Sequence, residues 1–121
     1  MATMNEVIER VDTVRPNVYP EESKYNWMAK LDGVVSLEVH NMEDPVLYDL
    51  PADADRELLI PAPFDDVYEL YVAAMIDFYN KEYNQYNNST LMFSERMDQY
   101  KAWYIRNNDP SKARNFRNVM G

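Results

Sequence analysis

The scarcity of glycine is the feature that most constrains this fold. The 121 residues include two glycines, Gly33 and Gly121. A β-rich protein of this size needs many tight turns, and these turns favour glycine where φ is positive. Long stretches with apolar residues at helical spacing fill the chain instead. The sequence therefore predicts a mainly α protein, a compact bundle of about four helices.

Four stretches carry this helical periodicity. The predicted helices cover residues 4–14, 20–40, 64–86 and 90–107. Thr3 followed by Glu6 has the spacing of a capping box and marks the start of the first helix. Pro16 ends it, and Pro20 occupies a favoured position at the start of the second. The tract 84–90 is rich in Asn and Ser, which favour caps and turns, so it is expected to separate the last two helices.

The third helix is apolar nearly all round, and this pattern predicts the central helix of the bundle. Met75 and Phe78 are expected to be well buried, with Trp27 and Leu31 of the second helix facing them. A buried Phe78→Ala substitution would then cost about 3–5 kcal/mol.

The segment 41–63 interrupts the helices. It holds four of the seven prolines and shows no helical period. Two apolar runs, 46–50 and 58–60, flank a polar link, so we expect either a short β-hairpin or an extended arm. Residues 1–108 then form a single helical domain, and 109–121 form a flexible basic tail.

The charge is acidic and unevenly distributed. The formal net charge is -9, and between Asp32 and Glu82 thirteen acids face only Arg56 and Lys81. An acidic surface disfavours contact with a phosphate backbone, so sequence-specific nucleic-acid binding is not expected. No apolar run approaches the ~20 residues of a membrane helix, and the opening residues lack a basic signal region. The sequence therefore predicts a cytoplasmic protein.

The sequence contains few candidate catalytic residues. The chain contains no cysteine, which excludes thiol catalysis and cysteine–zinc sites. It contains one histidine, His40, and a serine nucleophile has no evident base beside it. Asp53, Asp55 and Glu57 alternate like the opening of a calcium loop, but the loop glycine and the distal glutamate are absent. We expect no enzyme activity, no cofactor and no metal site, and a structural role for His40.

Two stretches carry a family resemblance. Residues 58–104 read LLIPAPFDDVYELYVAAMIDFYNKEYNQYNNSTLMFSERMDQYKAWY, and residues 9–39 read ERVDTVRPNVYPEESKYNWMAKLDGVVSLEV. Their pattern is an apolar run, a proline, an aspartate pair, a tyrosine-rich helix, an asparagine-rich turn and an amphipathic helix. This pattern resembles the head–tail connector, or head-completion, proteins of phages and prophages of Gram-positive bacteria.

The resemblance implies a helical subunit that assembles with its own copies into a ring between portal and tail. Its partners would be itself, the portal protein and the tail or neck proteins. It would be found in the bacterial host cytoplasm and then in the virion neck.

Two segments are candidates for the contacts of such a subunit. The apolar run Leu58, Leu59 and Ile60 lies outside the strong helices, and an exposed run of this kind marks a contact site. It could equally close one end of the protein's own core. The basic residues Lys112, Arg114 and Arg117 oppose the charge of the body and could meet an acidic neighbour, including another copy.

A second function is compatible with the charge. The chain could be an acidic DNA mimic, or a regulator that occupies a basic nucleic-acid-binding protein. Such a mimic needs carboxylates spaced like phosphates on one face. The acids here concentrate at helix starts and in the segment 41–63, so the connector interpretation is favoured.

Overall fold

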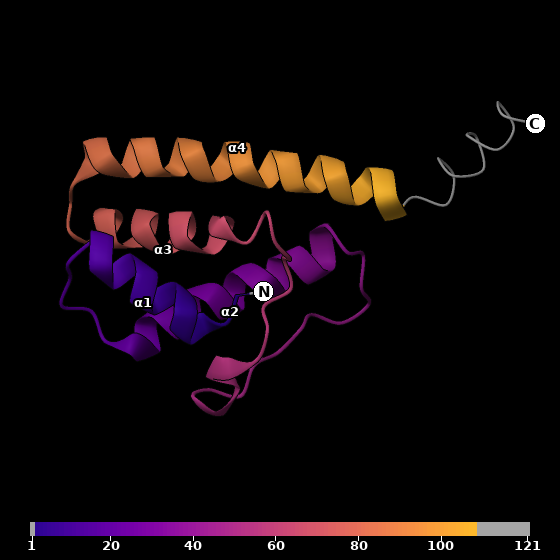
Figure 1. Ribbon diagram of the computed structural model, residues 1–121, viewed down its shortest axis with the longest axis horizontal. Coiled ribbons are helices and arrows are strands. Elements are labelled where there is room, and N and C mark those ends of the chain that lie inside the picture. The colour runs from indigo at the N-terminus through magenta and orange to yellow at the C-terminus, as the bar shows by residue number, and fades with distance from the viewer. Residues whose placement is uncertain (1, 109–121) are drawn as a thin grey trace, which may run out of the picture.

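The computed structural model describes residues 2–108. Within them lie four α-helices and one short 3-10 helix (Figure 1). In chain order these are α1 (Met4–Val14), α2 (Glu21–Glu38), η1 (Ala52–Asp55), α3 (Asp66–Tyr79) and α4 (Tyr83–Asn108). The described residues form no strand and contain one isolated bridge, between Thr3 and Glu57. The prediction of a mainly α protein with about four helices is therefore confirmed.

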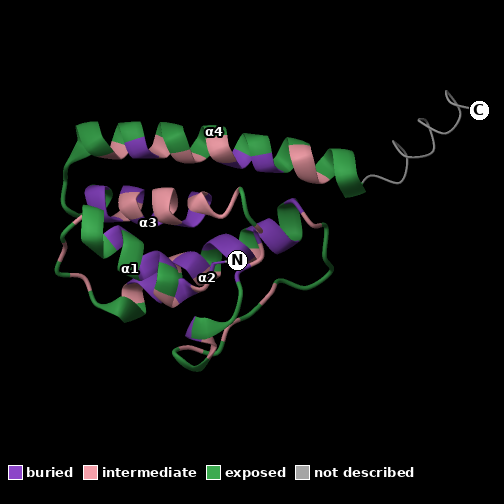
Figure 2. Ribbon diagram, in the orientation of Figure 1, coloured by how far each residue is buried: buried purple, intermediate pink, exposed green. Residues whose placement is uncertain are grey.

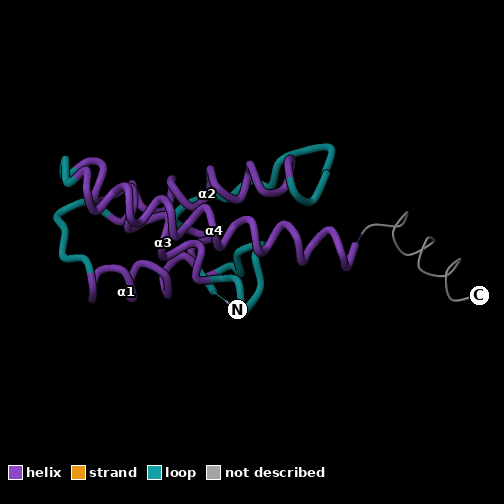
Figure 3. The backbone as a smooth tube through the Cα atoms, turned by 90° about the horizontal axis from the view of Figure 1, so that it is seen from above, coloured by secondary structure: helices purple, strands orange, loops and turns teal. Residues whose placement is uncertain are grey.

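The helix α3 is the centre of the bundle. It packs against α1, α2 and α4, whereas α4 makes its main contacts with α3 alone. In Figure 1, α1 and α2 lie below α3, and α4 runs back along the upper side of α3. Figure 3, seen from above, shows α3 and α4 between α1 and α2. Figure 2 shows the consequence, since the outward face of α4 is exposed along most of its length. The predicted central position of the third helix is correct.

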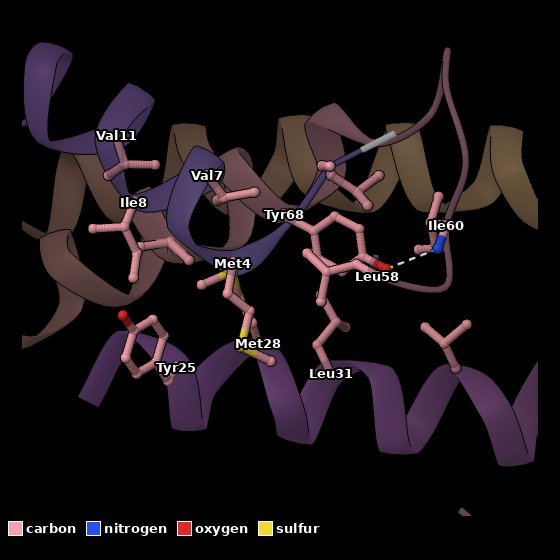
Figure 4. Close-up of a cluster of buried hydrophobic side chains, with 14 of the residues drawn as sticks. Met4, Val7, Ile8, Val11, Tyr25, Met28, Leu31, Leu58, Ile60 and Tyr68 are labelled. Atoms are coloured by element: carbon pink, nitrogen blue, oxygen red, sulfur yellow. Dashed lines mark hydrogen bonds between the residues drawn. The ribbon is translucent and has the colours of Figure 1, made fainter. Parts of the chain in front are cut away.

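The first helix has the predicted bounds and the predicted start. The Thr3 hydroxyl accepts a hydrogen bond from the Glu6 backbone N–H at 3.3 Å, which satisfies one free amide of the first turn. Its buried face consists of Met4, Val7, Ile8 and Val11. Figure 4 shows Met4 and Ile8 directed toward α2, where Tyr25, Met28 and Leu31 belong to the same core. The helix α1 also packs against α3.

The boundary between α3 and α4 differs from the predicted one. The chain turns at residues 80–82 rather than 84–90, because Lys81 adopts a left-handed φ of 61°. The N–H of Glu82 donates to the Asp77 carbonyl and the N–H of Lys81 donates to the Phe78 carbonyl. This is the Schellman pattern that ends a helix, although a lysine stands where glycine is usual.

This early turn changes the burial of the end of α3. Phe78 lies in the last turn of the helix and is 44% exposed, and Met75 is only half-buried. The expectation that both are well buried is therefore wrong. Leu31 does lie in the core, but the side chains it packs with there include Tyr68 of α3 (Figure 4), while Trp27 is half-buried.

The segment 41–63 forms neither a hairpin nor an extended arm. Its polar link folds as the 3-10 helix η1, so the run 46–50 does not pair with 58–60. The backbone N–H of Leu58 donates instead to the Ala2 carbonyl at 2.9 Å. The N–H groups of Leu59 and Ile60 donate to side chains of α2 and α3. Since all three amides have partners within the domain, no free strand edge remains.

Candidate interaction surface

A buried carboxylate fixes the segment 41–63 to the bundle. Asp32 of α2 has no exposed surface and accepts three hydrogen bonds. Its Oδ1 accepts from the Tyr68 hydroxyl at 2.6 Å, and its Oδ2 accepts from the Tyr48 hydroxyl at 2.7 Å and from the Leu59 N–H at 3.1 Å. Burial raises the pKa of Asp32, and the three hydrogen bonds partly offset that rise.

The same cluster extends through Tyr68. Its hydroxyl donates to Asp32 and accepts from the Ile60 N–H at 2.8 Å, as the dashed line in Figure 4 shows. Burial, together with the neighbouring Asp32 carboxylate, raises the pKa of Tyr68 and keeps it protonated. These groups therefore hold three parts of the chain together by hydrogen bonds, which is a structural role.

The apolar run predicted as a contact site lies mostly inside the protein. Leu58 is 3% exposed, Ile60 is fully buried, and Leu59 is half-buried. Of the two interpretations that the sequence left open, the structure therefore supports closure of the core. Leu58 and Ile60 pack beside Tyr68 (Figure 4) and are not available as a free contact surface.

His40 also has a structural environment. Its Nε2 lies 2.6 Å from the Tyr100 hydroxyl, and its ring stacks on Tyr104 with 4.4 Å between the ring centroids. Burial lowers the pKa of His40, although the negative charge of Asp32 opposes this effect. The imidazole thus connects the end of α2 to α4.

Two of the acidic residues that alternate like a calcium loop, Asp53 and Asp55, make local hydrogen bonds. Asp55 accepts from the Asn5 side chain at 2.7 Å, and Asp53 accepts from the Asp49 N–H at 2.7 Å. Among residues 2–108, no group of three or more acidic or histidine side chains is arranged to hold a metal ion.

A second buried carboxylate joins the helices at the other end of α3. Asp77 is fully buried, and its Oδ2 accepts from Arg15 at 3.1 Å and from the Ser89 hydroxyl at 2.9 Å. Arg15 follows α1 and Ser89 lies in α4, so this cluster links three helices. It also explains why residues 84–90 remain helical, since Ser89 directs its hydroxyl inward to Asp77.

Five aromatic side chains gather where α3 turns into α4, and we call this surface the aromatic corner. Its members are Tyr19, Trp27, Phe78, Tyr79 and Tyr86. Tyr79 is 50% exposed and stacks on Trp27 with 5.6 Å between the centroids. Phe78 contacts Tyr79 and Tyr86, both at 5.3 Å. The aromatic corner is a contiguous and partly exposed apolar surface.

A groove of about 340 Å³ separates α2 from α4. Its floor consists of apolar side chains from both helices, and Val34 at its edge is 56% exposed. The floor residues are Leu31, Val35, Val39, Phe93 and Met97. The polar residues Glu38, Ser94, Asp98 and Lys101 also line it. The groove exists because α4 rests on α3 and leaves the side of α2 uncovered.

Sequence reasoning missed both surfaces. The sequence places Val34 with Val35 in the apolar stripe of α2, and both were expected to be buried. Val34 is instead 56% exposed, and the only sequence signal was that adjacent residues of a helix point in different directions. The aromatic corner depends on the position of the α3–α4 turn, which no glycine marks. The predicted contact residues Lys112, Arg114 and Arg117 lie outside the described residues, as does the predicted tail 109–121.

Comparison with known proteins finds no relative. No protein-family model matches the chain, and no curated protein or solved structure is significantly similar to it. Between residues 2 and 108, none of the helices combines the length and hydropathy that a bilayer crossing requires.

Proposed function

We propose that this chain is a subunit of the head–tail connector of a phage or prophage of Gram-positive bacteria. In this role it assembles with its own copies as a ring between portal and tail. The sequence resemblance over residues 9–39 and 58–104 supports the proposal. The structural observation that carries it is the aromatic corner.

The aromatic corner has the chemistry of a contact surface between proteins. Aromatic side chains are enriched in the cores of interfaces, and a few of them contribute most of the binding free energy. Phe78 and Tyr79 remain about half exposed, although both are large and apolar. A ring requires one surface of each subunit to meet a different surface of the next. We assign the aromatic corner to one side of that contact, with the neighbouring copy as its partner.

The DNA-mimic alternative is less well supported by the arrangement of the acids. Asp32 and Asp77 are buried, and several other carboxylates pair with cations of the same chain. These pairs are Asp12–Lys24, Asp66–Arg96 and Glu69–Arg10. These five carboxylates are therefore partnered within the chain and do not contribute an unpaired charge to a row facing a basic partner. The connector role therefore remains our proposal.

The test is genetic and uses the parent phage. Interruption of the gene should give DNA-filled heads and separate tails in electron micrographs, and the wild-type gene supplied on a plasmid should restore tailed particles. Phe78→Ser should fold, as judged by circular dichroism, and fail to restore joining. The matched control is Leu91→Ser, which replaces an apolar side chain that is 60% exposed on α4 and lies outside the aromatic corner.

The outcomes separate the function from the surface. Infectious tailed particles from the interrupted gene would contradict the connector role. If the Phe78→Ser gene restores tailed particles where an empty plasmid does not, that result would support the connector role and exclude the aromatic corner as the contact. Failure of Leu91→Ser alone would place the contact on the outer face of α4.

A further inference from the structure

The groove between α2 and α4 is an apolar concavity lined by side chains of both helices. Its accessible apolar surface comes from Val34, which is more than half exposed, and from Phe93, which is half-buried. Leu31, Val35 and Met97 lie beneath them and are almost fully buried. The acidic residues Glu38 and Asp98 line the groove from α2 and α4, together with Lys101. The groove therefore suits a segment that combines apolar side chains with basic ones.

We propose that residues 109–121 of the same chain fold back and bind in this groove. The segment carries the apolar side chains Phe116, Val119 and Met120. It also carries the basic side chains Lys112, Arg114 and Arg117. The apolar set matches Val34 and Phe93, which supply the accessible apolar surface of the groove. The basic set matches Glu38 and Asp98, and such charge pairing fixes the orientation of a bound segment.

The length of the segment is sufficient for it to reach the groove. The helix α4 ends at Asn108, seven residues beyond Lys101, which is about 10 Å at 1.5 Å per residue. Thirteen residues span up to about 43 Å when extended. The segment begins with Asp109 and Pro110, and a proline lacks the N–H that a helix interior uses. The sequence of the segment is therefore compatible with a turn back toward the groove.

We expect the groove to bind the segment of its own chain rather than that of a second copy, because tethering raises the effective concentration of the segment at the groove. A tethered segment meets its site at an effective concentration in the millimolar range for a short linker. A free copy reaches such a concentration only in very concentrated solution. Binding within one chain therefore dominates for the isolated protein, and it is independent of any role in a phage particle.

Disulfide trapping tests the contact directly, because the natural chain contains no cysteine. One variant carries Val34→Cys in the groove and Val119→Cys in the segment. The control carries Met92→Cys with Val119→Cys, since Met92 is also more than half exposed on α4 and does not line the groove. Under mild oxidation at micromolar protein, the groove variant should form an intrachain disulfide at least about tenfold faster than the control.

A further substitution and a mixing experiment define the outcomes. Adding Phe116→Asp should lower the trapping rate of the groove variant to that of the control, while circular dichroism remains unchanged. Equal rates for the groove variant and the control would overturn the proposal. So would rapid formation of a disulfide-linked dimer when the Val34→Cys and Val119→Cys single variants are mixed, because that result would assign the groove to a second copy.

Discussion

Asp32 shows how a single residue can organise a long loop. It is a carboxylate without exposed surface, and no lysine or arginine among the described residues forms an ion pair with it. An isolated buried charge is costly, but hydrogen bonds to the charged form reduce that cost. Two tyrosine hydroxyls and one backbone amide supply these bonds. The loop 41–63 is therefore held by a few polar contacts rather than by sheet pairing.

Replacement of Asp32 tests this role. In Asp32→Ala, the hydroxyls of Tyr48 and Tyr68 and the N–H of Leu59 lose their acceptor, and the free energy of unfolding should fall by about 3–5 kcal/mol, since each unsatisfied buried group costs about 1–3 kcal/mol. Asp32→Asn keeps one acceptor oxygen and should lose less. Urea denaturation measures both values. Equal losses in the two variants would show that acceptance of these bonds is not what Asp32 contributes.

His40 offers a second test at the residue scale, because a single histidine gives a single titrating imidazole signal in NMR. Burial lowers its pKa, so the midpoint should lie below the ordinary value of 6.5. The folded state then favours the neutral ring. The resulting stabilisation is fully present above pH 6.5 and is lost as the pH falls through the lowered pKa. A midpoint at or above 6.5 would contradict the buried environment described for this ring.

At the scale of the elements, the bounds and the start of α1 were predictable and the α3–α4 turn was not. Val14 continues the apolar spacing of α1 but is 72% exposed in the last turn. The start of α1 depends on local chemistry, since Thr3 caps the helix and the apolar stripe follows at regular spacing. At the turn, Lys81 adopts a left-handed φ of 61°, which is unfavourable for a residue with a Cβ atom. Local sequence preference therefore does not explain the turn, and we attribute it to tertiary contacts. The Asn-rich tract 84–90 has low helix propensity, yet Ser89 bonds to Asp77 and packing on α3 keeps the tract helical.

The different environments of neighbouring α3 residues give a matched pair of substitutions. Ile76 is almost fully buried, so Ile76→Ala should reduce the free energy of unfolding by about 2–5 kcal/mol. Phe78→Ala should cost clearly less, because the ring is 44% exposed and little of a cavity would form. Chemical denaturation of both variants gives the comparison. A larger loss of free energy of unfolding for Phe78→Ala than for Ile76→Ala would show that the ring of Phe78 is buried, as the sequence predicted.

The helix α2 contains a replaceable glycine. Gly33 has no positive φ, and a Cβ atom added there would meet no atom within 4 Å. Alanine has a helix propensity about 1 kcal/mol better than that of glycine. Gly33→Ala should therefore raise the free energy of unfolding by up to about 1 kcal/mol, measured by thermal and urea denaturation. A loss of stability would indicate that α2 needs the flexibility of glycine at this point.

At the scale of the whole molecule, the number of helices and the central place of α3 could be predicted, but the working surfaces could not. Apolar periodicity locates the faces of helices, and it does not state which neighbour covers each face. The run 58–60 looked like a contact site because its apolar residues follow a proline-rich loop. In the fold, Ala2, Asp32 and Tyr68 satisfy its amides, and the run enters the core.

The two exposed apolar surfaces both follow from the position of α4. Because α4 begins at Tyr83 and lies along α3, the aromatic corner stays open at the turn and the groove stays open beside α2. In Figure 1 the C-terminal end of α4 projects from the opposite end of the bundle. An elongated subunit with a contact surface at one end is suited to assembly, which is the function proposed for it.

The most direct test of that assembly role is the location of the protein in purified virions. Gold-labelled antibodies raised against the chain should mark the junction between head and tail in electron micrographs of the parent phage, with no label on the capsid faces or the tail tip. Mass spectrometry of the same particles should detect the chain together with the portal protein. Purified, infectious virions that contain no detectable copy of the chain would contradict the account.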